Sequence, residues 1–102
     1  MDGIEVSRHA RKRTKERMGL NKKAVECNAQ KAFEYGITHK EAKGRLKKYL
    51  TKLFLTNRKI NNLRVYHRYV YLFAGNTLVT VIPLPSNLVS LADKLQDMKE
   101  EE

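Results

Sequence analysis

The sequence predicts an α+β fold: N-terminal helices packed on a small antiparallel sheet of about three strands, followed by a C-terminal helix. Two observations predict it. Apolar residues recur at helical spacing over 7–56, whereas residues 63–85 are rich in β-branched and aromatic residues. With 102 residues, 41% of them hydrophobic, the chain is large enough for one core. We therefore expect a single domain over 1–102, with a core over 7–85 and a C-terminal helix with an acidic tail over 86–102.

The first helix is expected between Ser7 and Gly19. Ser7 is a good N-cap because its side-chain oxygen can accept a hydrogen bond from a free amide of the first turn. Gly19 suits the position after the last turn, where the backbone needs a positive φ. Ala10, Thr14 and Met18 recur at helical spacing. They predict a weak stripe that faces the rest of the domain.

Two further helical segments follow. Asn21 is an N-cap for a helix that ends before Gly36. The sequence THKE (Thr38–Glu41) is a capping box, so a third helical segment is expected to begin there, weakened by Gly44. Residues 46–55 could instead form a strand. The positions that give this segment a helical face are Leu46, Tyr49, Leu50, Leu53 and Phe54.

Three strands are expected after residue 62, at 63–66, 69–75 and 77–85. The dipeptides His67-Arg68 and Gly75-Asn76 separate them as turns, which gives an antiparallel meander. Prolines end the third strand, and an amphipathic helix follows from Ser86. We expect the helices to cover one face of the sheet and to leave part of the other face exposed. The apolar side of the last helix is formed by Leu88, Leu91, Leu95 and Met98.

The charge is strongly basic, with a formal net charge of +10 at pH 7. Eight Lys or Arg lie in residues 8–23 and eight more in residues 40–59, whereas the last ten residues hold five acids and two bases. Such a field favours a polyanionic partner, either nucleic acid or an anionic membrane surface. A charged surface without any partner is the alternative. Membrane binding ranks last because the first helix lacks the large apolar face that such binding requires.

The composition also predicts what is absent. Cys27 is the only cysteine, so an internal disulfide and a cysteine-based zinc site are excluded. The three histidines have no metal-like spacing, and no Walker or Rossmann glycine pattern occurs, so we expect no metal and no cofactor. No apolar run is long enough to span a bilayer. These features favour a cytoplasmic protein. They do not indicate whether it is a monomer or an oligomer.

The first helix contains the only constellation with catalytic potential. His9, Arg13 and Arg17 lie four residues apart along one border of its inward stripe. Neighbouring cations favour a neutral imidazole, which is the form that acts as a base. Arg13 could hold a phosphate through a forked pair of hydrogen bonds. With a hydroxyl, these groups suffice for metal-free RNA cleavage through the 2′-oxygen. On helix geometry alone, a histidine that packs at the helix edge is the simpler interpretation.

The segment SRHARKRTKERMGLNKKAV resembles the opening of small proteins in the barnase–EndoU–colicin–RelE superfamily of ribonuclease-like toxins. The resemblance rests on His9-Ala10, on Arg13 and on Arg17, and it extends over residues 7–85 to the final strand LVTVIPLP. It implies a helices-then-sheet domain that acts on RNA, with Thr80 and Arg64 completing the site. It also implies a phage or mobile-element origin and a possible antitoxin partner.

Three hypotheses follow. The first is a metal-independent toxin-type ribonuclease with His9, Arg13 and Thr80 as catalytic residues. The second is a non-catalytic nucleic-acid-binding protein, with RNA favoured, and the third is a protein that docks on and inhibits a nucleic-acid-binding host enzyme. Exposed tyrosines of the sheet could stack bases, but a buried aromatic face is the more usual reading of such alternation. The residues expected to contact nucleic acid are Arg8, Arg11, Lys12, Arg17, Arg45, Lys47, Lys48, Arg64 and Arg68.

Overall fold

Helices and strands follow the predicted order in the computed structural model, which describes residues 4–19 and 21–101. The fold is α+β. One short strand precedes the helices and was not predicted from the sequence. The elements in chain order are β1 (Glu5–Val6), α1 (Arg8–Met18), α2 (Lys22–Tyr35), α3 (Gly44–Thr56), β2 (Asn62–Tyr66), β3 (Tyr69–Ala74), β4 (Thr77–Pro83) and α4 (Ser86–Glu100).

The sheet is mixed, with the strand order β1-β4-β3-β2. Strands β2, β3 and β4 form the predicted antiparallel meander. The number of strands is close to the predicted number of about three. The sheet is not antiparallel throughout, however, because β1 pairs in parallel with the start of β4, Glu5 opposite Thr77 and Val6 opposite Leu78. A two-residue strand carries too little alternation to be recognised in a sequence. It forms because the edge of β4 offers unpaired backbone groups.

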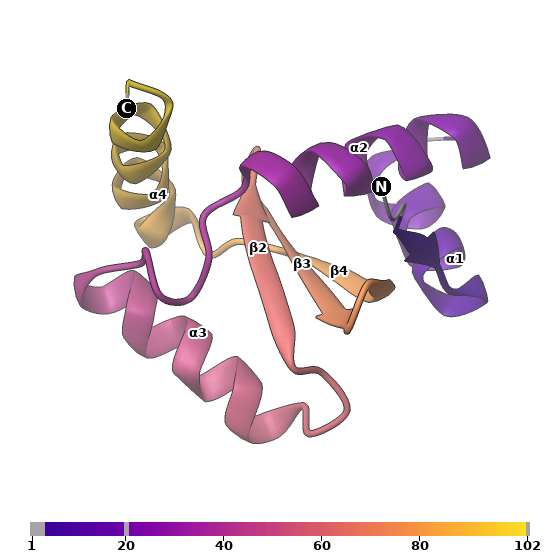
Figure 1. Cartoon of the computed structure of the whole chain (residues 1–102), viewed down its shortest axis with the longest axis horizontal. Helices are drawn as coiled ribbons and strands as arrows, with labels where there is room; N and C mark the ends of the chain where they lie inside the picture. The colour runs from indigo at the N-terminus through magenta and orange to yellow at the C-terminus, as the bar shows by residue number, and fades with distance from the viewer. Residues whose placement is uncertain (1–3, 20, 102) are drawn as a thin grey trace.

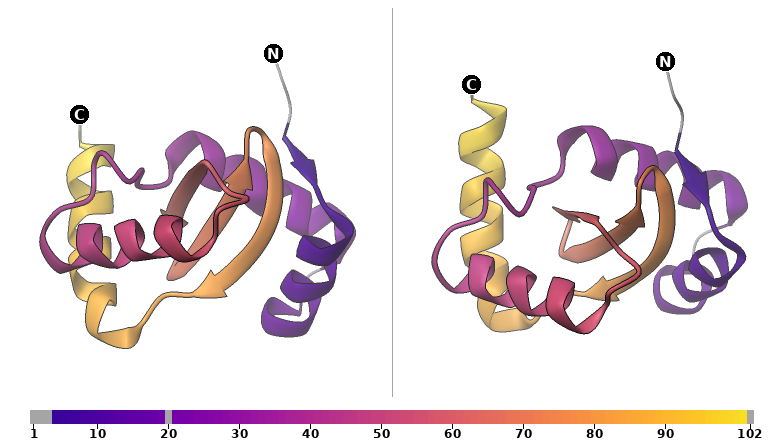
Figure 2. Two further views of the ribbon diagram at one scale, coloured as in Figure 1. Left: turned by 90° about the horizontal axis from the view of Figure 1, so that it is seen from below. Right: turned by 60° about the horizontal axis from the view of Figure 1, so that its bottom comes forward.

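Helices cover both faces of the sheet, so the expectation of a partly open face is wrong. On one face, Ala10 of α1 and Ala32 of α2 pack with Phe73 of β3. On the other face, Leu50 of α3 packs with Leu72 of β3 and with residues of α4. Figure 1 shows the sheet lying between the α1–α2 pair and the α3–α4 pair. The two views in Figure 2 show β4 running between α3 and α1.

The segment around the capping box differs from the prediction. Both hydrogen bonds of the box form, since Thr38 Oγ1 accepts from the Glu41 amide and Glu41 Oε1 accepts from the Thr38 amide. They close a single turn, however, and α3 begins only at Gly44, where φ is +58°. Gly44 therefore permits the chain to enter α3. Residues 46–55 are helical, which excludes the strand alternative.

Both predicted hairpin turns form. His67 and Arg68 connect β2 to β3, and Gly75 with Asn76 connects β3 to β4. In α4, Leu88 and Leu95 are buried as expected. Met98, by contrast, is 48% exposed.

Candidate nucleic-acid interface

Helix α1 is fixed at its start by Ser7. The hydroxyl of Ser7 accepts a hydrogen bond from the Ala10 amide at 3.1 Å, which is the predicted N-cap. At the other end, Gly19 has φ +66° and donates its amide to the Lys15 carbonyl. The only polar residue of the inward stripe, Thr14, is buried and donates to the Ala10 carbonyl at 2.6 Å. Met18, the third predicted member of that stripe, lies outside the residues whose side chains the structure describes.

Helix α1 also covers the outer edge of β4 beyond the point where β1 ends. The Ser7 amide donates to the Leu78 carbonyl at 3.0 Å, and its hydroxyl donates to the Val79 carbonyl at 3.3 Å. Two residues further along β4, Arg17 Nη1 donates to the Val81 carbonyl at 2.8 Å. These bonds satisfy backbone acceptors that an exposed edge strand would leave to water. Arg17 therefore attaches the helix to the sheet.

The remaining cations of α1 project into solvent. Arg8, Lys12, Arg13 and Lys15 are exposed. Within residues 4–19 and 21–101, ion pairs form only between Arg11 and Glu26 at 3.4 Å and between Lys99 and Glu41 at 2.9 Å. The four exposed cations therefore have no acidic partner in the described part of the chain. Arg11 is partly shielded and belongs to the contact with α2.

His9 is exposed and lies one helical turn before Arg13. Residues four apart share one side of a helix. Since Arg17 on this side reaches β4, His9 and Arg13 lie on the border of α1 that faces the strand edge. The described residues form no hydrogen bond to the imidazole of His9. The geometry leaves this side chain free to meet a ligand bound along α1.

Thr80 lies on the other side of β4. It is paired with Leu72, whose side chain belongs to the core beneath α3 and α4. Thr80 also lines a pocket of about 390 Å³ together with Val79 and residues 56–60, which are the last residue of α3 and the loop after it. The structure therefore does not bring Thr80 together with the pair His9 and Arg13. The sequence does not reveal this placement of Thr80. The register between β3 and β4 shifts between Leu72 and Phe73, so residues along β4 do not alternate regularly between the two sheet faces.

Arg64 is integrated into the fold. Its Nε donates to the Phe33 carbonyl at 3.1 Å, and its Nη1 donates to the Leu63 carbonyl at 2.8 Å and to the side chain of Asn62. The guanidinium also lies over the Phe33 ring, 5.0 Å from its centroid. Burial lowers the pKa of Arg64, and the negative charge of Glu41 partly opposes this shift. The Nε and Nη1 donors of Arg64 are thus directed at the protein and not at a phosphate.

The other predicted nucleic-acid contacts are separated from α1. Arg45, Lys47 and Lys48 are exposed on α3, which packs on the opposite sheet face. Arg68 is exposed in the β2–β3 turn. The predicted cations therefore divide into a group on α1, a group on α3 and a single side chain at the hairpin.

The aromatic residues of the sheet belong mainly to the core. Tyr71 and Phe73 are buried, as the more usual reading of the alternation predicts, whereas Tyr66 and Tyr69 are half-buried. Next to Tyr66, His67 is exposed and its ring lies 4.1 Å from that of the tyrosine, centroid to centroid.

The remaining histidine has a structural position. The Nε2 atom of His39 lies 2.7 Å from the Thr51 hydroxyl, and its ring meets the edge of Phe54. It thus ties the capping-box turn to α3. Among the described residues, no group of three or more His, Cys, Asp or Glu side chains is placed to hold a metal ion. None of the described helices has the length and apolar character needed to cross a bilayer.

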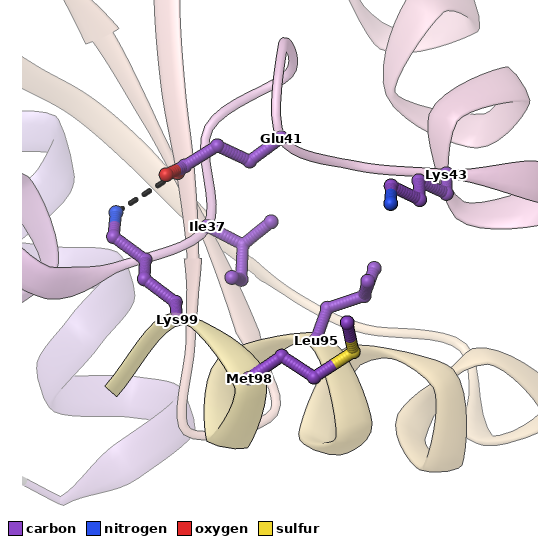
Figure 3. A pocket seen from close by; sticks show the side chains of 6 residues that line it. All are labelled: Ile37, Glu41, Lys43, Leu95, Met98 and Lys99. Atoms are coloured by element: carbon purple, nitrogen blue, oxygen red, sulfur yellow. Dashed lines mark hydrogen bonds and ion pairs between the residues drawn. The ribbon is translucent and has the colours of Figure 1, made fainter. Parts of the chain in front are cut away.

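A second pocket, of about 200 Å³, lies where α4 meets the capping-box turn. Figure 3 shows Leu95 and Met98 of α4 facing Ile37, with the Lys99–Glu41 ion pair at one side and Lys43 at the other. Sequence analysis did not single out Lys99. Its role depends on a contact between residues far apart in the chain, for which no local pattern exists.

The comparisons with known proteins leave the site to be interpreted from its geometry. No protein-family model, no curated protein and no solved structure matches the chain.

Proposed function

We propose that this protein binds nucleic acid, RNA in preference to DNA, and that the cations of α1 contact the phosphate backbone. The observation that carries the proposal is the exposed and unpaired set of cations on α1 within the described part of the chain. Unpaired cations on a chain of net charge +10 attract a polyanion and release its counterions on binding. The choice of RNA rests on the resemblance of the first helix to ribonuclease-like toxins.

Salt dependence tests this proposal. For a single-stranded RNA, each phosphate contact contributes about 0.7 to the slope of log K against log salt concentration. The variant Arg8→Ala/Lys12→Ala/Arg13→Ala is expected to reduce that slope by about 2 and to lower the affinity at physiological salt. Fluorescence anisotropy of a labelled oligonucleotide at five or more salt concentrations measures both quantities.

A matched control separates the α1 surface from net charge alone. Lys31→Ala/Lys40→Ala/Lys94→Ala removes the same charge from exposed positions outside α1. This control variant is expected to retain most of the wild-type slope of log K against log salt concentration. Equal losses in the two variants would mean that RNA responds only to the total charge, and a wild-type affinity insensitive to salt would overturn the proposal.

A second candidate function is metal-independent RNA cleavage, supported by the exposure of His9 beside Arg13. In this mechanism, the imidazole removes the proton of a 2′-hydroxyl and the 2′-oxygen attacks the adjacent phosphorus. The bond from phosphorus to the 5′-oxygen breaks, a 2′,3′-cyclic phosphate forms, and the 5′-oxygen leaves as a hydroxyl with a proton taken from water. Arg13 would stabilise the phosphorane charge. Thr80 has no part in this version because it lies on the other side of β4.

Cleavage of RNA in EDTA tests the second function. Wild-type protein is expected to cut, and His9→Ala is expected to lose at least a hundredfold in rate while binding with unchanged affinity. An oligonucleotide with a 2′-deoxy residue at the cut site is the control substrate and should resist. If His9→Ala cleaves as fast as wild type, the mechanism is wrong. If neither protein cleaves but both bind, the protein is a binding module.

A further inference from the structure

The β2–β3 turn has a backbone that its own residues do not favour. His67 has φ +46° and Arg68 has φ +69°, and the turn joins the directly paired Tyr66 and Tyr69. Two consecutive central residues with positive φ define a type I′ turn, for which Asn-Gly is the preferred sequence. Histidine tolerates this region better than most residues, but arginine does not. Here both positions carry large side chains where folding alone would select small ones.

The side chains at this turn form an exposed aromatic and basic tip. His67 and Arg68 are exposed, and Tyr66 and Tyr69 beneath them are half-buried. The rings of Tyr66 and His67 meet at an interplanar angle of 65°. Among described residues no acidic side chain pairs with Arg68. Strained backbone that presents such groups is typical of a binding site.

The tip lies at the same end of the sheet as the last turn of α1. Arg17 of α1 donates to the carbonyl of Val81, which is paired with Tyr71. Two residues further along β4, Pro83 is paired with Tyr69 at the base of the tip. A polyanion bound along α1 would therefore reach the tip by continuing in the same direction.

We propose that the β2–β3 tip, residues 66–69, is a stacking site for an unpaired base of single-stranded nucleic acid. The exposed ring of His67 offers a face to a base, the half-buried rings of Tyr66 and Tyr69 support it from the core side, and Arg68 offers its guanidinium to the neighbouring phosphate. Bases in a duplex are already stacked and present no free face, so the tip selects single strands. This inference rests on the proposed function and specifies its substrate as single-stranded RNA.

The decisive variant is His67→Asn/Arg68→Gly, which installs the sequence that the turn prefers. Thermal denaturation is expected to show a midpoint equal to or above that of the wild type, because the strain is relieved. Affinity for a labelled single-stranded oligouridylate is expected to fall about tenfold, the loss of one stacked base and one phosphate contact. An unchanged or raised melting midpoint together with loss of binding is a result that a purely structural turn would not give.

Single variants divide the effect. His67→Asn should weaken binding with the salt slope unchanged, because the ring of His67 contributes by stacking and Arg68 makes the phosphate contact. Arg68→Gly should reduce the slope by about 0.7. A duplex RNA of the same length is the second probe, and the double variant should bind it nearly as well as wild type.

The outcomes distinguish this inference from the proposed function. If the double variant binds oligouridylate as tightly as wild type while the α1 triple variant does not, the tip has no role and the α1 surface stands. A lower melting midpoint for the double variant would show that the turn favours His-Arg, which also overturns the inference. If wild-type protein binds neither probe, both proposals fail. If the double variant loses affinity for the single-stranded and the duplex probe to the same extent, the tip makes a charge contact without base stacking, and the inference is overturned.

Discussion

At the scale of single residues, Gly36 illustrates a glycine required for space. Its φ of −66° is open to any residue. A Cβ there would lie 2.6 Å from the Ala32 carbonyl oxygen and 2.9 Å from the Cβ of Arg64. Strand β2 approaches this closely because Ile37 pairs with Val65. The helix end and the strand can touch only where no side chain intervenes.

The substitution Gly36→Ala is therefore expected to lower the free energy of unfolding by about 2–3 kcal/mol, the cost of an overpacked site. Gly19→Ala is the matched control, since no atom of the described residues beyond its chain neighbours lies within 4 Å of its Cβ position, but φ is +66°. It should cost about 1 kcal/mol from backbone conformation alone. Urea denaturation of both variants measures the difference. Equal losses would show that β2 can move away from α2.

Tyr71 presents a buried hydroxyl at the centre of the sheet. It is 1% exposed, and its hydroxyl oxygen has no hydrogen-bond partner among the described residues. Burial raises the pKa of Tyr71 from 10.0 to about 12, with smaller contributions from Tyr66 and Tyr69. An unsatisfied buried hydroxyl reduces stability, so Tyr71→Phe is expected to raise the free energy of unfolding by about 1 kcal/mol.

The same group predicts a dependence on alkaline pH. The unfolded chain releases the Tyr71 proton near pH 10.0, whereas the folded chain retains it up to about pH 12. Between these values the folded state binds more protons, so its stability falls as the pH rises. Denaturation of Tyr71→Phe at several pH values above 9 should show a shallower fall than wild type. If the stability of the wild type and of Tyr71→Phe fell equally with pH, the result would contradict the burial of the Tyr71 hydroxyl.

At the scale of elements, the C-terminus of α2 is completed by side chains from other elements. Arg64 Nε donates to the Phe33 carbonyl, Gln96 Nε2 donates to the Tyr35 carbonyl at 2.8 Å, and Lys99 Nζ donates to the Gly36 carbonyl at 2.8 Å. Two of these donors are cations at the negative end of the helix dipole. The last residues of α2 include no base of their own. The packing of β2 and α4 therefore stabilises α2.

Lys99 makes two of the contacts that hold α4 in place, to the Gly36 carbonyl and to Glu41 Oε1. Lys99→Met is expected to lower the free energy of unfolding by about 1–2 kcal/mol, because the carbonyl of the buried Gly36 loses a donor, whereas the exposed Glu41 can turn to water. Lys94→Met on the exposed side of the same helix is the control and should change little. If the two variants unfold at the same urea concentration, the contact contributes nothing.

The ion pair also has a predicted pH dependence. Burial raises the pKa of Glu41, but hydrogen bonds from Lys99 and Thr38 outweigh it and leave the pKa below its usual value of 4.5. A lowered carboxyl pKa stabilises the fold above that value, and this contribution is lost as the pH falls through the folded pKa. The stability difference between wild type and Lys99→Met should therefore narrow below pH 4. A constant difference from pH 7 to pH 3 would assign the whole effect to the Gly36 contact.

At the scale of the whole molecule, the basic helix and the acidic helix lie far apart. Figure 1 shows α1 and α4 on opposite sides of the sheet, and each belongs to a different core cluster. The exposed acids Glu100 and Glu101 lie at the C-terminal end of α4. With α1 and α4 on opposite sides of the sheet, we expect these acids to leave open the α1 surface that is proposed to bind phosphate.

Neutralising these two acids tests that separation. Glu100→Gln/Glu101→Gln is expected to change RNA affinity less than about twofold at 0.15 M ionic strength, where the Debye length is about 8 Å. Anisotropy at that ionic strength, with the α1 triple variant measured beside it, provides the comparison. A tenfold tighter binding would show that the end of α4 competes with RNA for the basic surface.

The sequence alone determined the features that depend on neighbouring residues. The caps at Ser7 and Asn21 and the glycine at Gly19 were predicted, because a helix end needs particular donors, acceptors and φ values locally. The meander and its two turns were predicted for the same reason. The exposed charge of α1 followed from composition and helical period, so the residues proposed to grip phosphate were also named in advance.

Only the tertiary structure decided the features that join distant parts of the chain. The pairing of β1 with β4, the covering of both sheet faces, and the placement of Thr80 away from His9 depend on how the strands and helices pack. The role of Arg64 changed likewise, since its donors meet a carbonyl of α2 that lies 31 residues earlier in the chain. The physical reason is that local patterns encode period, caps and turns. Which faces and edges meet is set by burial and hydrogen-bond satisfaction over the whole fold.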